Sequence, residues 1–164
     1  MSIVVRRIQT GEAQILRQVR LAALADRPDA FGSTFAREVA FSDDVWAERA
    51  AEGATGGRAA TFFAWLADSP VGVVAGFRSD DAVDLMSMWT GPTARRQGIG
   101  RQLVDAVLTW AEAHDAARVE LWVMRGNDDA QRLYESMGFV VTDSGRVSPS
   151  DPCKDEIRMV RRLR

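Results

Sequence analysis

Two glycines lie in the stretch RRQGIGRQLV, residues 95–104, where an apolar helical pattern begins. Glycine lets a ligand come close to the backbone, and the start of a helix offers free N–H groups and a positive dipole end. The spacing Arg95-x-x-Gly98-x-Gly100 therefore fits a phosphate site, and it fits a plain turn with solvated arginines equally well. The stretch lacks the third glycine of a dinucleotide fingerprint, and the chain has no Walker loop.

Strands and helices are expected to alternate around this stretch. The patterns predict strands at residues 2–8, 61–67, 71–77, 82–90, 118–123, 139–143 and 155–163. They predict helices at residues 11–25, 43–51, 99–111 and 127–138, and loops at residues 26–34 and 144–152. The order indicates one α/β (α+β) domain over residues 1–164, with antiparallel strands early and a strand–helix–strand part late.

Composition limits the classes of partner. The 164 residues carry a formal net charge of −2, which argues against nucleic acid or an anionic membrane as the main partner. A single cysteine, Cys153, excludes an internal disulfide, and a single histidine, His114, argues against a zinc site with several ligands. No apolar run approaches the ~20 residues of a membrane span. We expect a cytoplasmic protein with no metal, no nucleic acid partner and no membrane partner.

A second motif joins the glycine stretch. The segment NDDAQRLYESMGF, residues 127–139, has the pattern Asn-x-x-Ala-x-x-x-Tyr-x-x-x-Gly-Phe. Together with Arg-x-x-Gly-x-Gly at 95–100, it resembles the GNAT superfamily of N-acetyltransferases. The strong resemblance covers residues 82–140, and a weaker one covers AALADRPDAFGST at residues 22–34. It implies a GNAT fold: a twisted mixed sheet of about seven strands flanked by helices, with strands four and five splayed apart.

The resemblance also implies acetyl-coenzyme A as cosubstrate. In the family, the N–H groups of the turn hold its pyrophosphate, and the pantetheine arm pairs with the preceding strand. These roles map to the turn residues Arg95, Arg96, Gln97, Gly98, Ile99, Gly100 and Arg101, and to the strand residues Met88, Trp89 and Thr90. Asn127 is a helix cap that can also contact the pantetheine, and Tyr134 completes the predicted cofactor contacts.

Acyl transfer from a thioester to an amine needs a neutral amine, a stabilised oxyanion and a protonated leaving thiol. Tyr134, the only tyrosine, is the candidate acid, because a phenol with a reference pKa near ~10 is a proton donor at neutral pH. Without the motif it would be an ordinary amphipathic helix residue. The candidate bases are Asp84 and Glu38, and either is equally consistent with a solvent-facing charge. An acceptor that binds as the free amine needs no base.

The sequence therefore predicts acetyl transfer to a primary amine of a small molecule, by direct attack in a ternary complex. A protein N-terminus or lysine is the alternative acceptor. A non-catalytic module that binds or senses acyl-coenzyme A is the alternative class. Dimers are common in the family, so a homodimer stays open, as do the acceptor and the choice of acetyl over another acyl group.

Overall fold

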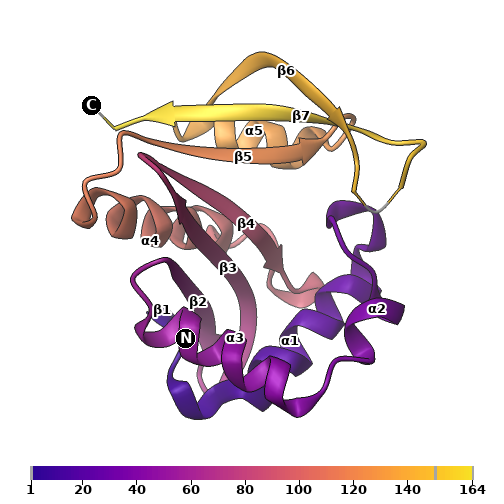
Figure 1. Ribbon diagram of the computed structural model, residues 1–164, viewed down its shortest axis with the longest axis vertical. Helices are drawn as coiled ribbons and strands as arrows, with labels where there is room; N and C mark the ends of the chain where they lie inside the picture. The colour runs from indigo at the N-terminus through magenta and orange to yellow at the C-terminus, as the bar shows by residue number, and fades with distance from the viewer. Residues whose placement is uncertain (1, 150, 164) are drawn as a thin grey trace.

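Seven strands form one mixed sheet in the computed structural model, which describes residues 2–149 and 151–163 (Figure 1). Their spatial order is β1-β2-β3-β4-β5-β7-β6, and only β4 and β5 pair in parallel. The strands are β1 (Ile3–Arg7), β2 (Ala59–Leu66), β3 (Ser69–Ser79), β4 (Ala82–Thr90), β5 (Arg118–Met124), β6 (Val140–Val147) and β7 (Asp155–Arg162). The predicted seven-stranded mixed sheet is confirmed.

Helices cover both faces of this sheet (Figure 1). α1 (Ala13–Asp26) and α3 (Asp43–Thr55) lie on one face, and α4 (Ile99–Ala113) lies on the other. α5 (Asp128–Ser136) packs against β5 and β7 on the α4 side through Tyr134 and the residues that follow it. Two short elements, α2 (Phe35–Val39) and a 3₁₀ turn at Pro28–Ala30, follow α1.

The amphipathic pattern of the sequence explains how α4 packs. Its first helical residue is Ile99, and every apolar residue of the predicted face is buried, namely Ile99, Leu103, Val104, Val107, Leu108 and Ala111. Burial of one large aliphatic side chain is worth roughly 1.5–3 kcal/mol, so this face holds α4 firmly against the sheet. The first turn of α4, which carries the glycine motif, is thereby fixed relative to β4.

Two elements differ from the sequence-based expectation. α2 was not predicted; it is a five-residue helix capped by Thr34, whose hydroxyl accepts the N–H of Arg37. β6 continues to Val147 and pairs with β7 through a region expected to be a loop. Pairing with β7 outweighs the turn-like composition there, and residue 150 of the predicted loop lies outside the described residues.

The sheet opens between β4 and β5. These strands pair only over residues 82–84 and 118–120, although β4 continues to Thr90 and β5 to Met124. A β-bulge lies beyond the paired part: the register with β3 shifts there, and Ser87 has φ +59°. Bulges bend a strand and turn its side chains, so the second half of β4 leaves β5 with one edge unpaired. The predicted splay of strands four and five is confirmed.

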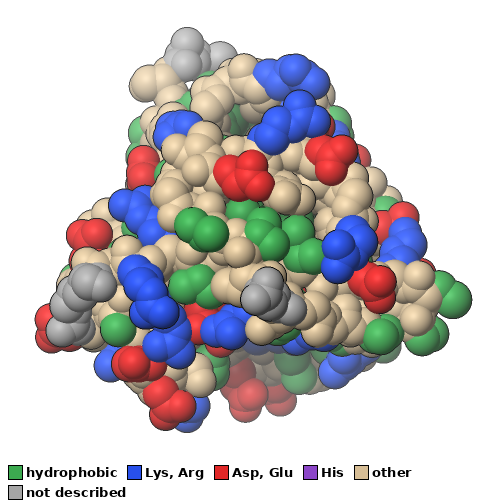
Figure 2. All heavy atoms as spheres, turned by 90° about the horizontal axis from the view of Figure 1, so that it is seen from above, with side chains coloured by type: hydrophobic (Ala, Val, Ile, Leu, Met, Phe, Trp, Pro, Cys, Tyr) green, Lys and Arg blue, Asp and Glu red, His purple; other side chains and the backbone are tan. Residues whose placement is uncertain are grey.

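The surface carries charges of both signs. Figure 2 shows one face, where a small group of hydrophobic side chains lies among acidic and basic ones. Strand β6, at the edge of the sheet, exposes Val140, Val141 and Val147. Among the described helices, none has the length and apolar character needed to cross a membrane.

Candidate active site

The glycine motif forms the left-handed turn that opens α4. Gly98 is the N-cap with φ +77°, and Arg96 before it also has a positive φ of +62°. The first helical hydrogen bond runs from the N–H of Gln102 to the carbonyl of Gly98 at 3.2 Å. The N–H groups of Ile99, Gly100 and Arg101 therefore have no acceptor within the helix, and they form a ready anion site.

Gly100 is more constrained than an open surface turn. A Cβ atom at this position would lie 3.0 Å from Cδ2 of Leu133 and 3.2 Å from Cε of Met88. The absence of a side chain thus allows α4, α5 and β4 to approach one another at the motif. A substitution at Gly100 therefore affects the junction of three elements.

A cavity of about 630 Å³ lies beside this turn, between β4, the start of α4 and α5; we call it the donor cavity. It is lined by ten of the twelve predicted cofactor contacts, namely Met88, Trp89, Thr90, Arg95, Arg96, Gly98, Ile99, Gly100, Arg101 and Asn127. Gln97 and Tyr134 do not line it. The unpaired edge of β4 and the free N–H groups of α4 therefore face the same space.

Asp26, which sequence reasoning missed, holds one wall of this cavity. Its carboxylate accepts the indole N–H of Trp89 at 2.9 Å and forms an ion pair with Arg95. Arg95 also donates Nε–H to the carbonyl of Thr90 at 3.1 Å. Burial raises the pKa of Asp26, but the bonds from Trp89 and Arg95 outweigh it and the net pKa is lowered. Arg95 thus ties the end of β4 to α1.

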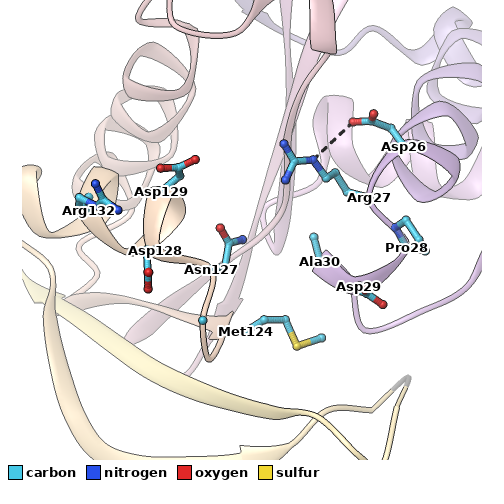
Figure 3. Close-up of a pocket in the computed structure, with 11 residues that line it drawn as sticks. Asp26, Arg27, Pro28, Asp29, Ala30, Met124, Asn127, Asp128, Asp129 and Arg132 are labelled. Atoms are coloured by element: carbon cyan, nitrogen blue, oxygen red, sulfur yellow. Dashed lines mark ion pairs between the residues drawn. The ribbon is translucent and has the colours of Figure 1, made fainter.

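The donor cavity continues toward the segment that follows α1 (Figure 3). A space of about 560 Å³ lies between this segment and the β5–α5 turn, and it shares Arg27, Ala30, Asn127 and Asp129 with the donor cavity. The guanidinium of Arg27 and the amide of Asn127 both project into it (Figure 3). Asn127 caps α5, since its Oδ1 accepts the N–H of Ala130 at 3.4 Å.

A second cavity, of about 380 Å³, lies on the other side of the opened sheet; we call it the acceptor cavity. Asp84 lines it from β4, Trp122 from β5, Arg146 and Glu156 from β6 and β7, and Arg20 from α1. Its lining shares Ala30 and Phe31 with the donor cavity. The two spaces are therefore neighbours that share a wall at the segment after α1.

Asp84 is a perturbed carboxylate in the acceptor cavity. Burial raises its pKa most, and the negative charge of Glu120 beside it raises the pKa further. The positive charges of Arg158 and Arg118 act in the opposite direction without reversing the shift. Perturbed titratable groups in clefts are typical of functional sites. Among the described residues, Asp84 forms no ion pair of its own.

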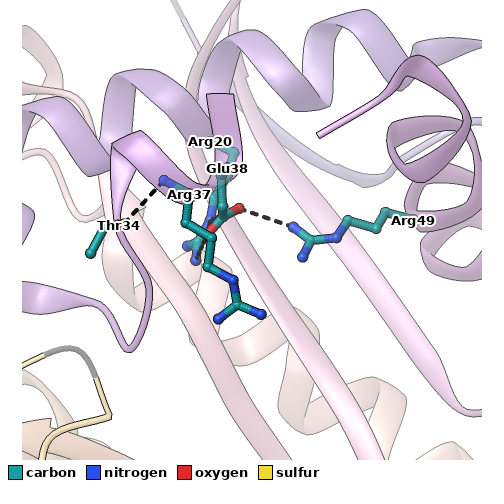
Figure 4. Close-up of polar contacts among 5 residues, drawn as sticks. All are labelled: Arg20, Thr34, Arg37, Glu38 and Arg49. Atoms are coloured by element: carbon teal, nitrogen blue, oxygen red, sulfur yellow. Dashed lines mark hydrogen bonds and ion pairs between the residues drawn. The ribbon is translucent and has the colours of Figure 1, made fainter. Parts of the chain in front are cut away.

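The other candidate base, Glu38, lies in a different setting (Figure 4). Its side chain is 1% exposed and is held by Arg20 and Arg49, each at 3.0 Å. Burial raises the pKa of Glu38, but the bonds and charges of Arg20 and Arg49 outweigh burial and lower it overall. Glu38 also does not line the acceptor cavity. These contacts favour a structural role for Glu38 over a role as base.

Tyr134 lies in the core beneath the donor cavity. It is 6% exposed, and its ring meets that of Phe139 edge to face with centroids 5.7 Å apart. Its neighbours on α5, Ala130 and Leu133, line the donor cavity. Burial raises the pKa of the phenol far above its usual range, so Tyr134 is protonated at neutral pH.

The sequence model of the acetyltransferase (GNAT) family matches residues 22–139. The chain belongs to this family. A GNAT acetyltransferase from Streptococcus pneumoniae superposes with a TM-score of 0.81 at 20% identity, covering 99% of this chain and 100% of that one. YncA, a putative acetyltransferase from Salmonella typhimurium solved with acetyl-CoA, superposes with a TM-score of 0.77 at 18% identity. The superposition covers 100% of this chain and 95% of YncA.

A third structure, the PaiA N-acetyltransferase from Thermoplasma acidophilum in complex with coenzyme A, gives a TM-score of 0.70 at 15% identity, covering 99% and 100%. At these identities the structures show the shared fold. A comparison of the sequence with curated proteins found no match.

As a GNAT acetyltransferase, the protein uses acetyl-CoA as its cosubstrate. Its own residues fit this molecule: free N–H groups at the start of α4 suit a pyrophosphate, and Arg27, Arg96 and Arg101 add positive charge around the donor cavity. Within residues 2–149 and 151–163, no group of three His, Cys, Asp or Glu side chains could hold a metal ion.

Proposed function

We propose that this GNAT acetyltransferase transfers the acetyl group to a primary amine of a small molecule by direct attack in a ternary complex. The observation that carries the proposal is that the donor and acceptor cavities adjoin and share Ala30 and Phe31 in their walls. Two substrates can therefore be held at once, with their reacting ends at the gap between β4 and β5. The acceptor cavity itself, at about 380 Å³, suits a small molecule, and it adjoins a groove of about 920 Å³ between α3 and the sheet.

Backbone groups hold the donor in this scheme. The N–H groups of residues 96–101 bind the pyrophosphate, and the unpaired edge of β4 at Met88 and Trp89 binds the pantetheine amides, as an added strand would. The carbonyl of Thr90 already accepts a hydrogen bond from Arg95. Thr90 therefore contacts the pantetheine only through its N–H group and its side chain. An N–H group of β4 near the bulge polarises the thioester carbonyl and stabilises the oxyanion.

Asp84 is the base in this proposal. Its carboxylate takes a proton from the acceptor ammonium, directly or through water, and the free amine nitrogen then attacks the thioester carbon. The tetrahedral intermediate collapses with cleavage of the C–S bond, and the nitrogen loses its second proton to solvent. A base with a raised pKa suits this task better than an ordinary aspartate, because its pKa lies nearer to the working pH.

Tyr134 stabilises the leaving sulfur. The pKa of this buried phenol lies above the ~8.5 of a thiol, so full proton transfer to the thiolate is uphill. We therefore assign Tyr134 chiefly a hydrogen bond to the departing sulfur, with solvent supplying the final proton. This role requires the hydroxyl to reach the gap between β4 and β5 from its place in the core.

The experiment is a screen for coenzyme A release with free amino acids, amino acid amides, diamines, amino sugars and peptides with free N-termini or lysines. Turnover with small amines supports the proposal. Turnover with peptides alone would assign the protein-acetylating alternative. Binding of acetyl-CoA without turnover on any amine would identify a binding module. We also propose that the protein is a homodimer. A molecular mass of 18.1 kDa, the mass of one chain, in analytical ultracentrifugation would exclude the dimer.

A further inference from the structure

A charged triad at the side of the acceptor cavity carries an excess of positive charge. Arg20 donates Nε–H and Nη2–H to Glu38 at 3.1 Å and 3.0 Å, and Arg49 donates Nη1–H to the same carboxylate at 3.0 Å (Figure 4). Two arginines thus share one glutamate, and the triad has one net positive charge. Glu38 is fully buried, and the side chain of Arg20 is only 14% exposed.

One donor of this triad is unused. Nη1 of Arg20 is buried and has no hydrogen-bond partner among the described residues. Its guanidinium lies over the ring of Phe31, 4.9 Å from the centroid, and Phe31 is one of the residues at which the two cavities meet. A buried charged donor without a partner is costly, and a shift of the Phe31 ring that exposes Nη1 to an acceptor on a ligand would remove that cost.

Arg20 also marks where the acceptor cavity opens into a larger space. It lines both the acceptor cavity and an adjoining groove of about 920 Å³ between α3 and the sheet, and Met86 and Ser87 are common to both. The other cation of the acceptor cavity, Arg146, is already paired with Glu156 at 3.2 Å and stacked on Trp122. Arg20 is therefore the side chain there with positive charge to spare.

The opposite charge lies in the same cavity. Asp84 lines it without an ion pair among the described residues, whereas the neighbouring Glu120 is bound by Arg118 and Arg158. One cavity of about 380 Å³ thus presents an unpaired carboxylate from β4 and an undercompensated guanidinium from α1. A zwitterion matches both charges. A polyamine does not, because its second ammonium would meet the net positive triad.

We propose that the acceptor is a small amine that also bears a carboxylate, with the amine at Asp84 and the carboxylate at Arg20. The proposal rests on the proposed function and names its substrate class. Phe31 and Trp122 are among the other residues that line the cavity, and their rings suit an apolar body between or beside the two charges. Free α-amino acids with apolar side chains are the simplest molecules of this class.

Matched substrate pairs test the carboxylate. Glycine, L-alanine, L-leucine, L-methionine and L-phenylalanine are each compared with their own primary amides by coenzyme A release. The amide keeps the amine and side chain and removes the charge. A lost charge-assisted hydrogen bond predicts at least about ten-fold lower kcat/KM for the amide of the best acid. Equal or better turnover of the amides overturns this inference and leaves the proposed function standing.

A matched pair of variants tests Arg20. Arg20→Lys keeps the charge that Glu38 requires and removes the planar fork, so the ratio of kcat/KM for acid over amide should fall at least about five-fold. Arg37→Lys is the control, because Arg37 lies one residue from Glu38 and points away from the triad (Figure 4). It should keep the wild-type ratio. Thermal unfolding checks that both variants are folded, and an unchanged ratio in folded Arg20→Lys overturns the assignment to Arg20.

A binding experiment distinguishes failure of the proposed function from failure of the carboxylate site. Calorimetry with coenzyme A present compares N-acetyl-L-leucine with N-acetyl-L-leucinamide, which need no chemistry. At least about ten-fold tighter binding of N-acetyl-L-leucine supports the carboxylate site, whether or not any amine is acetylated. If the acid binds more tightly and no amine is acetylated, the carboxylate site stands and only the proposed function is overturned. Equal binding of the two products overturns the carboxylate site.

Discussion

Asp84 and Glu120 are partners at the last position where β4 and β5 lie side by side. Both carboxylates lie on the face of the sheet away from α4, since their neighbours Val83, Leu85 and Leu121 pack in the α4 core. Glu120 is bound by two arginines, and Asp84 is not. Burial, and after it the negative charge of Glu120, therefore leave Asp84 with a raised pKa where the acceptor cavity begins.

The first prediction concerns Asp84 as base. Asp84→Asn should lower kcat by about 10²–10⁴-fold and remove the acidic limb of the pH–rate profile. In the wild type this limb should lie above ~3.9, the pKa of an ordinary aspartate, because the pKa of Asp84 is raised. Glu38→Gln, measured where it is folded, should leave the limb in place. A limb that stays put in both variants would mean that the acceptor binds as the free amine.

The same substitution should stabilise the protein. The folded protein holds the proton of Asp84 more tightly than the unfolded chain does, because its folded pKa is raised. Stability from this group is thus greatest at acid pH and is lost as pH rises through the window above ~3.9. Asp84→Asn should therefore raise Tm relative to wild type at pH 7, and the difference should shrink toward pH 4. A lower Tm at pH 7 would contradict this account.

Glu120→Gln should shift the pKa of Asp84 downward. It removes the negative charge that raises this pKa and frees Arg118 and Arg158, whose charges favour the ionised Asp84. The acidic limb of the pH–rate profile should move to lower pH, while Asp84 remains in place. The exposed Glu112 on α4 gives a matched control, since Glu112→Gln should leave the profile unchanged. A limb that moves upward would exclude Glu120 as the neighbour responsible.

Tyr134→Phe should lower kcat by about 10-fold to 10²-fold and leave the KM for acetyl-CoA unchanged. We expect a loss in kcat at or below the low end of the range for removal of a general acid, because the raised pKa of Tyr134 limits proton transfer from its hydroxyl. The ring still packs on Phe139, so Tm should change little. An intact kcat would leave Tyr134 as a core residue.

A pair of variants at Gly100 separates charge from packing at the anion site. Gly100→Ala brings a Cβ against Leu133 and Met88, whose flexible ends must shift, and it keeps the N–H groups of the turn. Gly100→Glu adds a negative charge at the site of the pyrophosphate. Acetyl-CoA affinity, measured by calorimetry, should fall at least about 10-fold more for Glu than for Ala, or roughly 1.4 kcal/mol. Equal losses would assign the effect to packing alone.

Local patterns made much of this site predictable. The bounds of β4 match the expected strand at residues 82–90, and the left-handed turn at Gly98 matches the glycine spacing. Both features depend on residues that are neighbours in sequence. The Ser42 cap of α3 and the contact of Phe41 with Trp46, whose ring centroids lie 5.9 Å apart, likewise join residues that are close in sequence.

Contacts between distant residues could not be read from one sequence. Asp26 meets Trp89 and Arg95 across more than sixty positions, and no local pattern indicates that pairing. The two ion pairs of Glu38, with Arg20 and Arg49, join α1, α2 and α3, and no local pattern indicates them. The bulge at Ser87 could not be predicted from a glycine in the sequence, because the residue with positive φ there is a serine.

The short pairing of β4 with β5 has a mechanical consequence. β2 and β3 pair along most of their length, whereas β4 and β5 are joined over residues 82–84 and 118–120 alone. Backbone pairing between neighbouring strands is therefore shortest along this line. The line divides the sheet into β1–β4 and β5–β7, and α4 bridges the two parts because it contacts β1–β4 and β5. One hydrophobic core, built on α4, holds side chains from both parts of the sheet, so packing rather than backbone pairing keeps the gap between β4 and β5 at a fixed width.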